Sequence, residues 1–280
     1  MFLKFSYFLF AIFLYLLAST PFSWADFNNN SPKPVPQPIQ EMFQSNLVYP
    51  QEKNELQLTL FPSFNKSNDS EITRTLFEIE YGITDAFQII FEWDGLLTKN
   101  MDDGPTYSGS GDIELGVQYS FMGLGDGDTH FSLGSLAEIP IGSVESGLSD
   151  GFLEIQSFIV LAHDFPNYNQ SQIFIEFGFN WIDQIRNVSA PKARFNSFIW
   201  NIGAFFPYYS WRATIELNGK TNAWHGGNEN NIYITPGFIY KLSKAWEIGV
   251  ATPIGITNSS DAYRAIGYLM WEFELDNVFD

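Results

Sequence analysis

The most constraining feature of this sequence is a period-two alternation of apolar and polar residues between Phe77 and Phe121. Such alternation places the two sets of side chains on opposite faces of a β-strand. Three successive runs show it, and their apolar members are Phe77, Ile79, Tyr81, Ile83; Phe87, Ile89, Phe91, Trp93; and Ile113, Leu115, Val117, Tyr119, Phe121. The alternation lasts roughly ten residues per run, the length of a tilted strand that crosses a bilayer. The pattern therefore predicts an outer-membrane β-barrel.

The remainder of the chain repeats this pattern and predicts about twelve strands in all. The predicted strands cover residues 55–64, 77–83, 87–94, 112–121, 130–141, 152–162, 173–181, 196–206, 211–218, 231–242, 246–256 and 263–275. In the sixth run the faces are ambiguous, because Phe158 and Val160 share a face with Glu154 and Gln156. We therefore predict an all-β fold, a transmembrane, antiparallel, up-and-down β-barrel.

The connections between these strands alternate in length. Short turns, such as the one at Asp85, alternate with mostly longer loops rich in Asn, Ser, Gly and Asp. Bacterial barrels place short turns in the periplasm and long loops outside the cell. We expect the loops around Asp103, Glu145 and Gly226 to face outside.

The composition agrees with a barrel of a Gram-negative outer membrane. Aromatic residues make up 18% of the chain, charged residues only 16%, and cysteine is absent. A lipid-facing band with aromatic girdles would account for these values. A large soluble β-protein is the alternative.

The amino terminus predicts export. Residues 1–25 resemble a cleaved signal peptide, with Lys4 before an apolar block over residues 5–17 and small residues at Ser23 and Ala25. A membrane anchor is the alternative, but the block is short and no basic cluster follows it. Residues 26–53 are rich in Pro and Asn, which predicts a flexible periplasmic segment, and residues 54–280 form the predicted barrel.

The formal charge of −18 argues against nucleic-acid binding and is compatible with a lumen that favours cations. The residues that alternate with the apolar set are expected to line that lumen. Those that we predict there are Glu78, Glu80, Glu92, Asp94, Asp112, Glu114, Glu138, Glu176, Arg212, Glu216, Lys241, Glu247, Arg264 and Glu272. They would form either a salt-bridged structural network or a polar conduit.

Signals for catalysis and cofactors are weak. No Gly-x-Ser-x-Gly elbow is present, and no two of the histidines His130, His163 and His225 have the spacing of metal ligands. We expect no enzyme activity, no catalytic residues, no metal and no cofactor.

Short motifs add a resemblance. Residues 81–85 (Tyr-Gly-Ile-Thr-Asp), 109–116 (Gly-Ser-Gly-Asp-Ile-Glu-Leu-Gly) and 138–142 (Glu-Ile-Pro-Ile-Gly) resemble the outer-membrane family labelled "MetA-pathway of phenol degradation". The resemblance implies a barrel that moves small, including aromatic, compounds across the outer membrane. The Pro-Thr-Gly ending usual in that family is absent here.

Three functions follow, in order of preference. The first is a passive, porin-like channel or uptake protein for small solutes, including aromatic or hydrophobic ones. The second is a structural or surface-interaction barrel without transport, and the third is an outer-membrane hydrolase. The expected partners are outer-membrane lipid and lipopolysaccharide, a small-molecule solute, and the periplasmic chaperone and barrel-assembly machinery.

Overall fold

The computed structural model describes residues 37–67, 70–125, 127–184, 196–222, 230–261 and 263–275. The predicted signal peptide, residues 26–36, the loop around Gly226 and His225 lie outside these ranges. Within them, no helix is long and apolar enough to cross a membrane.

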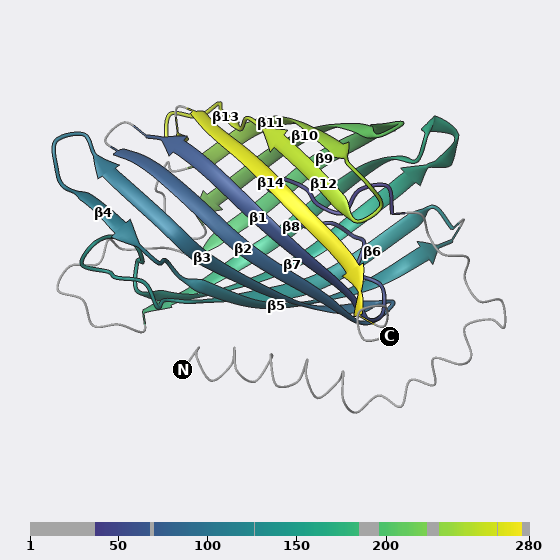
Figure 1. Cartoon of the computed structure of the whole chain (residues 1–280), viewed down its shortest axis with the longest axis horizontal. Helices are drawn as coiled ribbons and strands as arrows, with labels where there is room; N and C mark the ends of the chain where they lie inside the picture. The colour runs from purple at the N-terminus through teal and green to yellow at the C-terminus, as the bar shows by residue number, and fades with distance from the viewer. Residues whose placement is uncertain are drawn as a thin grey trace. The chain divides into compact units, whose positions relative to one another are not determined.

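The described residues form a closed antiparallel β-barrel (Figure 1). Its strands are β1 (Glu55–Lys66), β2 (Ser70–Thr84), β3 (Phe87–Met101), β4 (Thr106–Gly109), β5 (Ile113–Leu124), β6 (Thr129–Ile139), β7 (Phe152–Phe165), β8 (Ser171–Gln184), β9 (Ser197–Tyr208), β10 (Trp211–Asn222), β11 (Asn230–Lys241), β12 (Trp246–Ala251), β13 (Ile254–Gly255) and β14 (Tyr263–Glu274). Each wall strand pairs with its neighbours in the chain, and β1 pairs with β14 to close the ring. Twelve strands of the described chain make the wall, and β4 and β13 are short additions.

The two faces of the wall are inverted relative to a soluble protein. Large apolar side chains point outward and are exposed, as Phe177 is at 52% and Val250 at 65%. Polar side chains point inward, and Gln57, Glu176 and Glu216 are 0% exposed. An apolar exterior around a polar interior is what a bilayer requires. The predicted fold is confirmed, and the soluble alternative is wrong.

Outward aromatic side chains gather at both ends of the wall. Beside the short turns, Trp246 stacks on Trp271 with ring centroids 5.5 Å apart and planes 6° apart. Near the opposite end of β8, Phe179 packs edge-on against Trp181 and Phe198. These positions match the aromatic girdles that mark the two bilayer interfaces.

The second and third strands are longer than the alternation predicted. β2 and β3 each span 15 residues, and β4 pairs with the end of β3. On this part of β2 the outward positions are Thr73 and Thr75, so the apolar signal ends while β-branched side chains keep the strand extended. A bulge near Gly95 shifts the register there. The sequence placed residues 65–76 in a loop between the first two strands, and this is wrong, because β1 ends at Lys66 and β2 begins at Ser70.

Candidate functional site: the lumen and its internal loop

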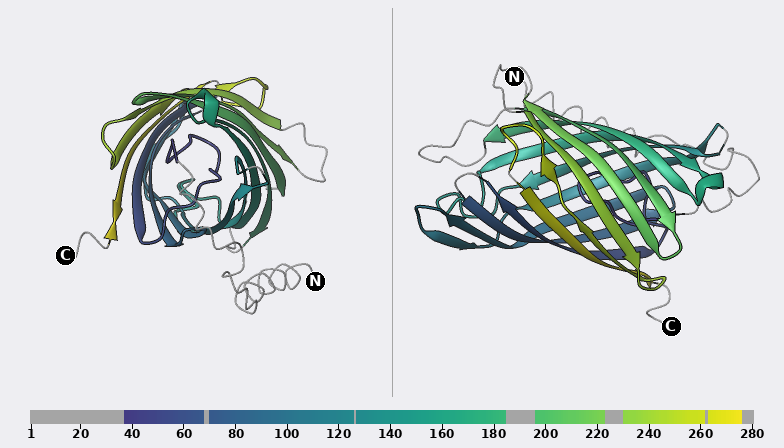
Figure 2. Two further views of the ribbon diagram at one scale, coloured as in Figure 1. Left: turned by 90° about the vertical axis from the view of Figure 1, so that its right-hand side faces the viewer. Right: turned by 90° about the horizontal axis from the view of Figure 1, so that it is seen from above.

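Residues 37–53, which we call the internal loop, lie inside the ring of strands as far as Gln51, and Glu52 and Lys53 are exposed (Figure 2). Its apolar side chains fill part of the lumen, and those that are buried are Ile39, Met42, Phe43, Val48 and Tyr49. The sequence favoured a flexible segment here because its prolines and aperiodic pattern match no helix or strand. The described part of that segment differs from the expectation, since the barrel interior supplies the partners that the loop lacks within itself.

The loop enters and leaves at the end of the barrel that carries the short turns. The carbonyl of Pro38 accepts a hydrogen bond from the Arg212 side chain near the start of β10. At its other end, the Gln51 backbone N–H donates to Gln88 Oε1 near the start of β3. Residues 42–46 therefore form an apex that projects into the lumen.

A carboxylate on β10 holds one side of this apex. Glu216 accepts hydrogen bonds from the backbone N–H groups of Phe43 and Gln44, both at 3.2 Å, and from the Ser45 hydroxyl. Hydrogen bonds to an ionised acceptor are the strong class. This one side chain thus fixes three consecutive loop residues.

A second carboxylate, on β8, holds the next residue. Glu176 accepts from the Asn46 backbone N–H at 3.1 Å and from its side-chain amide at 2.7 Å. Asn201 on β9 also donates to Glu176, at 2.7 Å. The carboxylate is fully buried, and these amide donors offset part of the cost of its desolvation.

A third anchor lies nearer the short turns. The Tyr49 hydroxyl donates to Asp164 at 2.9 Å, and His130 Nε2 lies 2.9 Å from the other oxygen of that carboxylate. His130 Nδ1 accepts from the Gly123 backbone N–H, so the proton of a neutral ring resides on Nε2. Both ring nitrogens are therefore engaged, and the His–Asp pair has no ring nitrogen left to activate a nucleophile.

Two glycines allow the loop to approach the wall. A Cβ at Gly82 would lie 1.9 Å from the Glu52 carbonyl oxygen. A Cβ at Gly237 would lie 2.4 Å from the Phe43 ring. Any other residue at these positions would displace the loop.

A cavity of about 520 Å³ separates the apex from the wall formed by β1, β2 and β3. Its lining is mixed in chemistry. Apolar side chains on the wall are Phe61, Ile72, Leu76, Ile90, Leu97 and Ile266, and charged ones are Arg74, Glu78, Glu80, Glu92, Asp94 and Arg264. Both arginines have acidic partners, Arg74 with Asp94 and Arg264 with Asp261.

Carboxylates form a row across part of the inner face of the wall. Glutamates occupy directly paired positions on five successive strands, and they are Glu78, Glu92, Glu114, Glu138 and Glu154. Like charges opposite one another destabilise a sheet. We call this row the acidic ladder.

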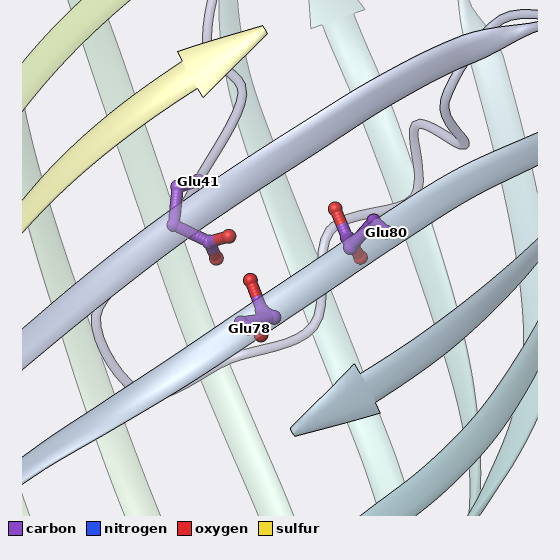
Figure 3. A group of neighbouring side chains, drawn as sticks. All are labelled: Glu41, Glu78 and Glu80. Atoms are coloured by element: carbon purple, nitrogen blue, oxygen red, sulfur yellow. The ribbon is translucent and has the colours of Figure 1, made fainter. Parts of the chain in front are cut away.

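The loop adds a further carboxylate beside the ladder. The side chains of Glu41 and Glu78 point toward one another, with Glu80 alongside (Figure 3). Carboxylate oxygens of the three residues lie within 4.8 Å of one another, a spacing at which they could share a proton or hold a cation. Burial, reinforced by the charge of Glu80, raises the pKa of Glu41 well above its usual range.

Solved structures of low sequence identity share this architecture. A crystal structure of an outer membrane channel from Pseudomonas putida F1 matches with a TM-score of 0.66 at 9% identity, over 83% of this chain and 100% of that chain. The NanC porin matches with a TM-score of 0.52 at 12% identity, over 78% and 100% of the two chains. The KdgM porin matches with a TM-score of 0.50 at 10% identity, over 77% and 99%.

The fold is that of an outer-membrane β-barrel. No protein-family model and no curated protein matches the sequence. The phenol-degradation family label therefore stays a prediction, while the barrel itself is shown.

The structure places the predicted lumen residues of this outer-membrane barrel in several settings. Five border the cavity, and they are Glu78, Glu80, Glu92, Asp94 and Arg264. Three hold the internal loop, and they are Arg212, Glu176 and Glu216. Glu114 and Glu138 belong to the acidic ladder. Asp112 accepts a hydrogen bond from the Gly142 backbone N–H, and Lys241 lies 3.7 Å from Glu247. Glu272 on β14 is paired in register with Gln57 on β1.

Sequence reasoning missed Glu41 and Tyr49. Both lie in the segment predicted to be flexible, and no local pattern marks them. The apolar residues interspersed among its prolines were the available signal for packing.

Proposed function

We propose that this protein is a passive channel that admits small solutes across the outer membrane. The observation that carries the proposal is a polar, cavity-containing lumen inside a closed barrel, narrowed by a loop rather than filled by the wall. A barrel of this size is intermediate between packed eight-stranded barrels and open porins. An internal loop is then a means of setting pore size.

The acidic ladder supports a preference for cations. Rings of Asp or Glu side chains give cation channels their selectivity. Like charges at directly paired positions disfavour strand pairing, so pairing of the strands does not explain the ladder. We infer that its carboxylates attract cationic solutes into the cavity.

The apolar side of the cavity supports solutes with an apolar part. Phe61, Ile72 and Leu76 face the same space as Glu78 and Glu92. This mixture agrees with the aromatic or hydrophobic solutes that the family resemblance implied. The partners that we propose are those of a barrel in this membrane: lipopolysaccharide, periplasmic chaperones and the barrel-assembly machinery.

Liposome swelling tests the proposal. Vesicles that contain the refolded protein should admit small amines and sugars, at rates that fall as solute size rises. Empty vesicles and vesicles with a packed eight-stranded barrel serve as controls.

The second candidate, a structural barrel with a closed lumen, is favoured by the buried contacts of the internal loop. Folded protein that admits no solute, with or without the loop, would support it and reject the channel.

A further inference from the structure

The internal loop is attached to the barrel through side chains of the wall. Within the described ranges, every hydrogen bond between residues 37–51 and a strand has a side chain on the strand. The backbone ladder that closes the barrel makes no bond with this part of the loop. The loop can therefore leave the lumen without breaking a rung of the wall.

We propose that Glu176 and Glu216 are positioning residues that set the effective size of the pore by holding the loop apex across the lumen. This inference rests on the proposed channel function. The two carboxylates act on passing solute through the loop, not by contact with it. When the apex is released, the path through the barrel widens.

Carboxylates suit this role because both of their oxygens only accept hydrogen bonds. Glu216 meets two backbone N–H groups and a hydroxyl, and Glu176 meets a backbone N–H and two amides. Neither forms an ion pair with a lysine or arginine of the described chain. The loop's own donors are therefore their principal partners, and loss of either carboxylate should shift the loop toward its released state by about tenfold.

Substitution at Glu216 provides the first test, with single-channel conductance as the readout. Glu216→Ala should raise the occupancy of a large-conductance level, and Glu216→Gln, which keeps one acceptor, should have an intermediate effect. Ser45→Ala removes the hydroxyl that donates to Glu216 and accepts from Asn218, and it leaves the carboxylate charge unchanged, so it should act in the same direction.

A loop deletion separates positioning from charge. In a variant that lacks residues 37–50, Glu216→Ala should leave the size of the large-conductance level unchanged. An equal effect of Glu216→Ala with and without the loop would overturn the inference, because the residue would then act through its own charge.

Cross-linking provides a test that does not depend on weakening the fold. The chain has no cysteine, and the Ser45 hydroxyl lies 3.3 Å from Asn218 Nδ2 on β10. In the variant Ser45→Cys, Asn218→Cys, a short reducible bifunctional thiol reagent should abolish the large-conductance level, and reduction should restore it. Verified cross-linking without any change in conductance would reject the inference.

The two proposals fail in different ways. If the loop-deleted barrel folds but conducts nothing, the channel function is wrong. If it conducts while the cross-link changes nothing, only the positioning role is wrong.

Discussion

A charge at Phe177 tests whether the outer face meets lipid. Phe177 is the seventh of the 14 residues of β8 and is half-exposed on the outer face. Its neighbours across the ladder are Ile159 and Trp200, so an arginine there would find no acid at the paired positions. Near the middle of a bilayer such a charge costs about 2–4 kcal/mol. Phe177→Arg should therefore lower the folding equilibrium constant by about 30- to 900-fold.

Urea titration of refolding into lipid vesicles measures this cost. Phe177→Leu should cost less than about 1 kcal/mol, because lipid adapts to a smaller apolar side chain whereas a packed core does not. Ser63→Arg is the lumen control, since Ser63 lines the cavity together with several acids. Asn180, the inward residue near Phe177, is too enclosed for this purpose, at 2% exposure. Equal stability of Phe177→Arg and the unmodified protein would refute the lipid-facing assignment.

Three further predictions concern charge, topology and pH. Reversal potentials in a salt gradient should show cation preference, and Glu78→Gln with Glu80→Gln should reduce it; a preference for anions would contradict the role of the lumen carboxylates. Cysteine placed at Asp103 should react with an impermeant thiol reagent on intact cells and cysteine at Asp85 should not, whereas the reverse pattern would invert the topology. Because the pKa of Glu41 is raised in the docked loop, docking should weaken as the pH rises above the usual value of 4.5, so conductance should rise with pH. Glu41→Gln should make the conductance less dependent on pH. An unchanged pH profile in this variant would show that Glu41 does not control docking of the loop.

The strands were predictable because each side chain of the wall faces one of two environments, the lipid outside or the polar lumen inside. Strand β8 shows this alternation, and the sequence assigned both of its faces correctly. Phe177 and Phe179 lie on the outer face, and Glu176 and Gly178 lie on the inner face. On β7 the alternation is obscured, because Phe158 points inward. It does so over Gly134, where a Cβ would lie 2.3 Å from its ring. A glycine on the neighbouring strand gave the apolar side chain a place inside the lumen.

The positions of the internal loop and of the acidic ladder could not be predicted from the local alternation of residues. Tyr49 and Asp164 are 115 residues apart in the chain, and no local signal pairs them. The ladder depends on the register between neighbouring strands. A shift of one residue would turn the side chains of a strand to the opposite face of the wall. The sequence could therefore assign Glu92 and Glu114 to the lumen without placing them opposite one another.

The most direct test of the account is the single-channel conductance of the full chain and of the variant without residues 37–50, measured in the same planar bilayers. Both proteins should fold into the bilayer, and the variant should conduct in a larger, steadier level, because the internal loop narrows the path in the full chain. Identical conductance of the two would show that the loop does not lie on the path. If both proteins fold and neither conducts ions, the barrel is not a channel.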